Sequence, residues 1–87
     1  MEQKKAMRVI VLAGRNAAVV EDVKRVLREA GVALRSLECR DWSASDWQVH
    51  VEFPLPEPQR LDAILRAVEA VKGVAVMAAA EVAERRS

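Results

Sequence analysis

Residues 7–31, MRVIVLAGRNAAVVEDVKRVLREAG, contain the change of periodicity that most constrains the fold. Residues 7–13 form an apolar, β-branched run with almost no polar alternation, which is typical of a central strand covered on both faces. After a polar turn, apolar side chains recur with helical spacing over residues 17–30, with Asn16 as the predicted N-cap and Gly31 as the C-terminal stop. The segment therefore predicts a strand followed by a crossover helix.

The next two segments predict a pair of strands joined by a polar turn. Residues 32–42 are strand-like, but Leu34 and Leu37 are three positions apart and cannot face the same side of an unbroken strand. We therefore expect a bulge between these two leucines. After the turn, apolar side chains alternate strictly with polar ones over residues 47–53, which is the clearest strand pattern in the chain.

The last third of the chain predicts a helix and a final strand. Residues 54–58, PLPEP, are expected to form a stiff connection outside the sheet, because proline lacks a backbone donor. A helix that ends at Gly73 follows, and its apolar face consists of Leu61, Ile64, Leu65, Val68 and Val71. Residues 74–83 are apolar enough for a strand, although their alanine content leaves a helix open from Ala78 onward.

The order of these elements predicts an α+β fold. Strand, helix, strand, strand, helix, strand with right-handed crossovers gives the ferredoxin-like βαββαβ arrangement, a four-stranded antiparallel sheet with two helices on one face. A chain of 87 residues closes one hydrophobic core. We expect one domain over residues 7–83, a flexible N-terminal segment at residues 1–6 and a flexible tail at residues 84–87.

Composition excludes several classes of function. The formal net charge of +1 provides no strong field for nucleic acid or an anionic membrane surface. The apolar stretches are shorter than the roughly 20 residues that span a bilayer. A single cysteine, Cys39, cannot form an internal disulfide, and the N-terminus lacks a secretory cleavage site. We therefore expect a cytoplasmic domain that binds no nucleic acid and does not insert into a membrane.

The first strand predicts a surface for a protein partner. If its valines meet the helices, Ile10 and Leu12 point out of the opposite face, where an apolar patch would mark a docking surface. Arg35 and Arg40 place charge on the second strand, which disfavours pairing of that edge with another chain, whereas the last strand has little charge. The candidate interface is Ile10, Leu12, Val76 and Ala78, and the expected partner is a second copy, as a homodimer, or a domain of a parent protein. Alternatively, the polar residues at 48, 50 and 52 dilute the patch to ordinary surface.

Catalytic, metal and cofactor sites are not predicted. The chain has no glycine-rich phosphate loop, and its serines have no triad geometry around the only histidine, His50. Cys39, His50 and Glu52 are metal-binding residue types, but their spacing matches no known metal site. Trp42 and Trp47 bracket the polar turn without forming an aromatic platform for RNA. We therefore expect a protein that is not an enzyme and holds no cofactor.

Two long segments resemble the ACT domain, a small regulatory module of many amino-acid-metabolism enzymes. They are MRVIVLAGRNAAVVEDVKRVLREAGVALRSLE at residues 7–38 and LDAILRAVEAVKGVAVM at residues 61–77, so that the resemblance spans about residues 7–82. The residues most like the family are Glu29-Ala30-Gly31-Val32 and Lys72-Gly73-Val74. The resemblance implies a non-catalytic regulatory or interaction domain.

The resemblance also implies a candidate ligand site in the turn after the first strand. ACT domains commonly carry an acidic or polar residue followed by Pro-Gly there, and they bind a small amino acid at the helix N-terminus. The corresponding residues of this chain are Gly14, Arg15, Asn16, Ala17 and Ala18. Alanines stand where the family has proline and glycine, so an ordinary turn with Asn16 as the cap is the alternative interpretation.

A second resemblance accounts for the missing Pro-Gly. The segment LRSLECRDWSASDWQVHVEFPLP at residues 34–56, followed by RLDAILRAVEAVKGVAV at residues 60–76, is similar to the soluble C-terminal domain of MgtC/SapB-type membrane proteins. That domain is ACT-like and has no established amino-acid pocket. This resemblance implies a domain excised from a longer membrane protein.

Overall fold

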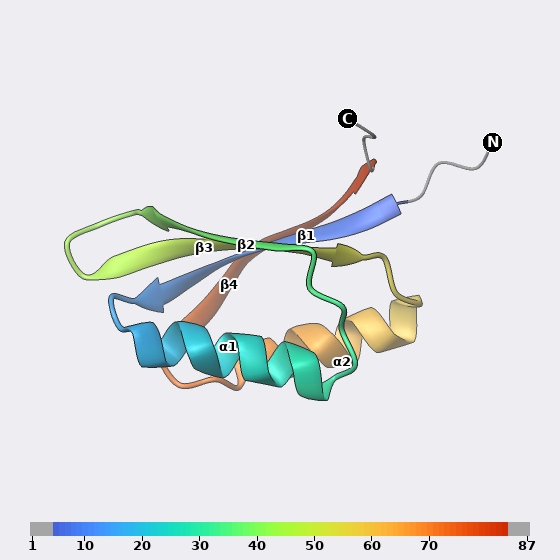
Figure 1. Cartoon of the computed structure of the whole chain (residues 1–87), viewed down its shortest axis with the longest axis horizontal. Coiled ribbons are helices and arrows are strands. Elements are labelled where there is room, and N and C mark those ends of the chain that lie inside the picture. Colours follow the sequence, from blue (N-terminus) through green and yellow to red (C-terminus); the bar gives the residue numbers. More distant parts are fainter. Residues whose placement is uncertain (1–4, 84–87) are drawn as a thin grey trace.

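Strand β1 (Lys5–Gly14) opens the part of the chain that the structure describes, residues 5–83. In this computed structural model the elements that follow are α1 (Ala17–Glu29), β2 (Ser36–Asp41), β3 (Asp46–Pro54), α2 (Pro58–Glu69) and β4 (Val74–Ala83). The sheet has the order β2-β3-β1-β4 with every neighbouring pair antiparallel. Both helices lie on one side of the sheet (Figure 1). The predicted ferredoxin-like arrangement is confirmed.

The two ends of the chain were predicted to be flexible. Of these segments, residues 1–4 and 84–87 lie outside the described residues. Lys5 and Ala6 belong to β1, so the strand begins two residues earlier than the apolar run predicts. Ala6 pairs with Pro54 on one side and with Val82 on the other, and it is fully buried. Pairing on both sides therefore extends the strand past its apolar part.

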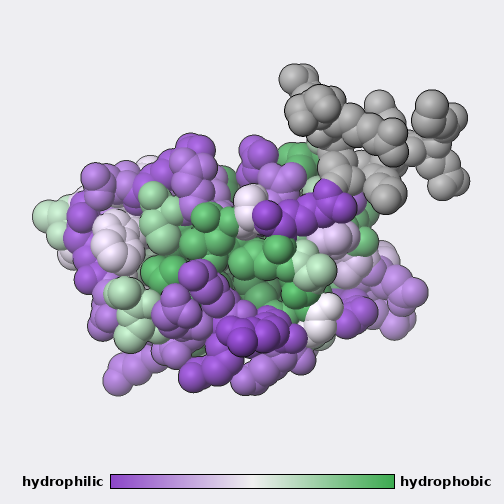
Figure 2. All heavy atoms as spheres, viewed as in Figure 1, coloured by the Kyte–Doolittle hydropathy of each residue, from purple (hydrophilic) through white to green (hydrophobic). Residues whose placement is uncertain are grey.

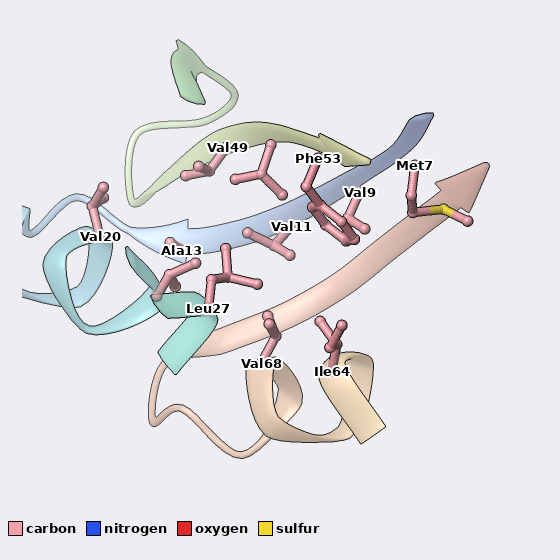
Figure 3. Packing of buried hydrophobic residues seen from close by; sticks show 12 residues of the cluster. Met7, Val9, Val11, Ala13, Val20, Leu27, Val49, Phe53, Ile64 and Val68 are labelled. Atoms are coloured by element: carbon pink, nitrogen blue, oxygen red, sulfur yellow. The ribbon is translucent and has the colours of Figure 1, made fainter. Parts of the chain in front are cut away.

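The core lies between the sheet and the two helices (Figure 3). Val9 and Val11 of β1 are almost inaccessible to solvent, as are their β3 partners Val51 and Val49. The other members of the buried cluster are Met7, Ala13, Val20, Val23, Leu27, Phe53, Ile64 and Val68. Each large apolar side chain that is fully buried contributes about 1.5–3 kcal/mol relative to an exposed one. Helical and strand periodicity thus converge on one core, as predicted.

Both ends of α1 are fixed by polar contacts. Asn16 is the N-cap, with an extended backbone and a side-chain Oδ1 that accepts a hydrogen bond from the Ala18 backbone N–H at 2.9 Å. At the other end, Gly31 has a φ of 79°, in the left-handed region that favours glycine. A side chain at this position would also meet the guanidinium of Arg60, which donates to the carbonyl oxygen of Ala30 at 3.0 Å. The predicted cap and stop are both confirmed.

The bulge predicted between Leu34 and Leu37 is absent from β2. This strand begins only at Ser36, so Leu34 lies in the irregular connection before it. Both leucines are half-buried against the core, because the connection is free of the strand alternation. The sheet is irregular elsewhere: the pairing of β1 with β4 changes register between Ile10 and Val11, which leaves Met77 of β4 without a partner in β1.

The proline-rich connection is shorter than predicted. Pro54 is the last residue of β3, where it lies opposite Ala6, and Pro58 is the first residue of α2. Proline is tolerated at both places because neither the end of a strand nor the first turn of a helix requires its missing N–H. The alternative of a helix from Ala78 onward is resolved in favour of a strand that continues to Ala83.

The side of the domain seen in Figure 2 carries apolar side chains at its centre, between the sheet and α1, with charged side chains around them. The connection from α1 to β2 crosses this side (Figure 1), and its Val32 and Leu34 are half-buried against the core. This connection therefore closes the space between α1 and the β2 side of the sheet.

Among the described residues, no helix is both long enough and apolar enough to cross a bilayer.

Candidate functional site

The turn between β1 and α1 carries the five residues implied as a ligand site. Gly14 ends β1, and Arg15, Asn16, Ala17 and Ala18 are exposed. The φ of Gly14 is not positive, and a Cβ built on it would meet no atom within 4 Å. The turn therefore requires glycine for neither its backbone conformation nor its packing.

Arg15 is held by the hairpin between β2 and β3. Its Nε donates to the carbonyl oxygen of Ser43 at 2.9 Å, and its Nη2 lies 2.9 Å from Oδ1 of Asp41. Its backbone N–H donates to the carbonyl oxygen of Ser45 at 3.2 Å. These contacts make Arg15 a link between the turn and the β2–β3 hairpin, and Asp41 already balances its charge.

The amides at the start of α1 are also engaged. The N–H of Ala18 donates to the Asn16 side chain, and the N–H groups of Val19 and Val20 donate to the Asn16 carbonyl oxygen at 3.0 and 3.4 Å. Free amides at a helix N-terminus are what makes it a site for anions. Here two of these donors, the N–H groups of Ala18 and Val19, are engaged by Asn16, and the Val20 N–H makes the first regular i→i−4 bond of the helix.

The helix-free face of the sheet, called the open face below, has an apolar half over β1 and β4. Ile10 and Leu12 are half-buried there, opposite the helix-covered side where Val9 and Val11 are buried, as the alternation predicts. The cross-strand partners of Ile10 and Leu12 in β4 are Ala78 and Ala75. Both alanines are exposed, so this half of the face is apolar without being covered by protein.

Met77 completes this apolar half. Its side chain is 41% exposed, and its Sδ lies 3.7 Å from Nε2 of Gln48 in β3. Because β1 separates β4 from β3, this contact places the Met77 side chain over the open face. Val76 instead pairs with Val11 and packs against the core. The register change therefore separates Val76 from Ala78, and Val76 does not share the open face with the other three candidate interface residues.

The other half of the open face is polar and carries balanced charge. Arg8 Nη2 lies 3.3 Å from Glu52 Oε2, and Arg40 Nε lies 3.0 Å from Glu38 Oε1. These two pairs surround a shallow depression of about 160 Å³, which is lined by Arg8, Ile10, Ser36, Glu38, Arg40, His50, Val51 and Glu52. Two positive and two negative side chains leave this half without net charge.

His50 lies between the two ion pairs, opposite Ile10 on one side and Glu38 on the other. Its Nε2 is 2.6 Å from Oε1 of Gln48. Partial burial, together with the positive charge of Arg40, holds the pKa of His50 below its ordinary value. The hydrogen bond and the charge of Arg40 lower the pKa of Glu38.

The metal-binding residue types do not come together. Cys39 pairs with Val49, on the helix-covered side of the sheet, whereas His50 pairs with Glu38 on the open face. Cys39 is exposed at the edge of the sheet. Within residues 5–83 there is no group of three His, Cys, Asp or Glu side chains that could hold a metal ion.

Sequence reasoning missed the two features that most affect the interpretation. The link from Arg15 to Asp41 joins residues that are far apart in the chain, and only the pairing of β2 with β3 brings the hairpin to the turn. The register change at Met77 lies among alanines, where the pattern carries no signal for it. The sequence carried one signal for this change: in the run from Ala75 to Ala80, Val76 and Met77 are the two residues that are not alanine, and Met77 is the larger.

Several solved structures are similar to this chain. The C-terminal domain of the MgtC protein from Mycobacterium tuberculosis has a TM-score of 0.69 at 14% identity, covering 97% of this chain and 92% of that one. The ACT domain from the GTP pyrophosphokinase of Chlorobium tepidum has a TM-score of 0.67 at 9% identity, covering 93% and 100%. For the regulatory subunit of aspartate kinase from Thermus thermophilus the TM-score is 0.66 at 17% identity, covering 87% of this chain and 50% of that subunit.

No family model and no characterised protein matches the sequence. At these identities, the structural similarities establish how the backbone is arranged and not what it binds. Two of the three structures, the ACT domain and the MgtC domain, represent the two resemblances that the sequence carries. The chain therefore has an ACT-like fold.

Proposed function

We propose that this chain is a non-catalytic, ACT-like regulatory or interaction domain that acts by pairing with a second copy of itself through the open face. The observation that carries the proposal is the apolar half of that face. Ile10, Leu12 and Met77 lie together over the middle of the sheet, and neither helix covers them. Contiguous apolar surface of this kind marks sites of protein association.

The polar half of the open face supports a neutral partner. The charges of Arg8 and Arg40 are balanced by those of Glu52 and Glu38. A strongly acidic or basic partner would gain little from such a surface. A second copy related by a two-fold axis presents the same balanced pairs and the same apolar half, which is what an isologous interface requires.

Two alternatives use the same fold differently. The first is an amino-acid sensor that binds at the turn between β1 and α1, but Arg15 already contacts Asp41 and Asn16 already caps the helix. The second is a cytoplasmic C-terminal domain of an MgtC/SapB-type membrane protein, for which the similarity to the MgtC domain is the support. In that case the open face would dock onto another part of the parent protein.

Sedimentation between micromolar and millimolar concentration tests the proposal. We expect the wild type to dimerise across this range and Ile10→Lys to remain monomeric, because pairing would bury the charge of the lysine against the apolar half of the second copy. Ala63→Lys is the matched control, since Ala63 is exposed on α2 and the variant adds the same charge away from the sheet. A wild type that is monomeric throughout, or an Ile10→Lys variant that dimerises like the control, would refute pairing through the open face.

A thermal-shift panel of amino acids separates the sensor from the interaction domain. A ligand at 100 times its dissociation constant adds about 2.7 kcal/mol to the stability of a protein that binds it. We expect no amino acid to produce an increase of this kind, because Arg15 is engaged with the β2–β3 hairpin and Asn16 with the Ala18 N–H. Stabilisation by one amino acid that is abolished by Arg15→Ala would establish the sensor instead.

A further inference from the structure

The outer edge of β4 differs from the other edge of the sheet. β4 is the last strand in the order β2-β3-β1-β4, and among the described residues no strand pairs with its outer side. Residues 78–80 are three exposed alanines, whose small side chains leave the backbone accessible. The only charged residue of β4 is Glu81. An edge of this kind lacks the charged side chains that usually prevent pairing.

A groove runs beside this edge on the helix-covered side. Its volume is about 390 Å³, and it is lined by Met7, Leu55, Pro56, Pro58, Leu61, Ala79, Ala80 and Glu81. Leu61 comes from the first turns of α2, and Leu55 and Pro56 come from the connection that leads into that helix. The lining is apolar except for the carboxylate of Glu81.

We propose that the edge of β4 and this groove together bind an extended segment of another polypeptide. A strand added to β4 satisfies the unpaired backbone groups and turns alternate side chains toward the helices. Ala79 lies opposite Val9, on the helix-covered side, so a side chain of the added strand beside Ala79 enters the groove. The segment therefore carries an apolar residue for the groove and, two positions away on the same face, a lysine or arginine beside Glu81.

The groove favours such a segment over β4 of a second copy. The side chains that β4 presents on the helix-covered side near the groove are Ala79 and Glu81, and an alanine is too small to fill a volume of about 390 Å³. Antiparallel pairing of residues 79–83 with themselves, with the helices of both copies on the same side, also places the two Glu81 carboxylates directly opposite each other. Like charges placed so are destabilising. This site is separate from the open face, through which the second copy is proposed to bind.

A displayed library of random peptides of roughly ten residues, selected on the wild-type domain, tests the proposal. We expect enriched peptides with alternating apolar residues and a lysine or arginine two positions from the main apolar residue. The synthetic form of the most enriched peptide should shift the amide signals of residues 78–83. Failure to enrich any peptide of this pattern, or amide shifts confined to other parts of the sheet, would overturn the proposal.

Two alanine-to-lysine variants provide the matched comparison for the enriched peptide. Ala79→Lys places a charged side chain at the groove and should weaken binding by about tenfold or more. Ala63→Lys, at an exposed alanine of α2 that lines neither the groove nor the open face, should leave binding unchanged. Equal affinity of the peptide for Ala79→Lys and for the wild type would overturn the site. So would a wild-type dimer that Ala79→Lys abolishes and that the peptide does not displace.

Discussion

The turn between β1 and α1 lies next to the open face of the sheet, since Arg15 of the turn follows Leu12 of the open face by only three residues. The two regions differ in which of their groups lack a partner within the domain. In the turn, the guanidinium of Arg15 and the side chain of Asn16 have partners within the domain. On the open face, Leu12 and Met77 have no helix above them. Polar groups with internal partners gain little from a ligand, whereas uncovered apolar surface gains from being buried.

The fold that the ACT resemblance implies must therefore be distinguished from the ligand site that it implies. The ACT-like backbone is present, and so is a helix that begins after the first strand, next to the turn that the resemblance implies as a ligand site. The side chains there form a cap and a link to the β2–β3 hairpin instead. A turn can therefore keep its place in a fold while its donors are used for stability.

The largest expected effect comes from the core on which both regions rest. Ile64 of α2 is buried and points toward the sheet (Figure 3), so Ile64→Ala should lower the free energy of unfolding by about 2–5 kcal/mol. Denaturant unfolding measures the loss. Arg66→Ala on the exposed side of the same helix is the control and should change stability by no more than about 0.5 kcal/mol. A similarly small loss for Ile64→Ala would mean that α2 does not pack as described.

A smaller loss of stability is expected from a substitution that affects the turn alone. Asn16→Ala removes the side-chain oxygen that accepts from the Ala18 N–H and should lower stability by about 1 kcal/mol. Asn16→Ser retains a capping oxygen and should recover most of the loss. Urea unfolding of the three proteins compares them directly. If alanine and serine were equivalent at this position, Asn16 would not be acting as a cap and its side chain would again be a candidate ligand contact.

The smallest effect concerns the pH dependence of the open face. The pKa of His50 lies below its ordinary value of 6.5, mainly because of burial and then because of Arg40, while the nearby Glu38 raises it and Arg8 lowers it. The unfolded chain therefore binds the proton more readily than the folded one. The contribution of His50 to stability is complete above about pH 6.5 and is lost as the pH falls through the folded-state pKa.

His50→Gln removes this titration. Stability measured between about pH 7 and pH 5 should fall less steeply for His50→Gln than for the wild type. Glu38 has a lowered pKa and titrates below 4.5, so its own transition lies outside this window. Parallel curves for the two proteins would show that the environment of His50 does not disfavour its charged form.

The sequence predicted the parts of the fold that depend on periodicity. The helix after Asn16 and the strand ending near Phe53 repeat apolar residues at one spacing over several turns or pairs, so local pattern and core agree. The prediction of a bulge between Leu34 and Leu37 was wrong because the connection before β2 is irregular, and strand alternation does not apply to it. Strand ends at Lys5 and Pro54 were missed because pairing with neighbouring strands extends them.

The candidate site was less predictable, because it depends on contacts between distant segments. Ile10 and Leu12 were placed on the open face from alternation alone. Val76 was grouped with Ala78, as regular alternation would allow, but the unpaired Met77 moves Val76 to the other face. An alanine-rich strand allows such a change of register at little cost in packing, since its side chains look alike from either face.

A dilution series of amide NMR spectra tests most directly whether the domain pairs through the open face, as proposed, and not through the turn. Between millimolar and micromolar concentration, we predict shifts for the amides of residues 10–12 and 75–78, which carry the apolar half of the face. The amides of residues 15–19 should not move. Spectra that do not change on dilution, or changes centred on residues 15–19, would contradict the claim.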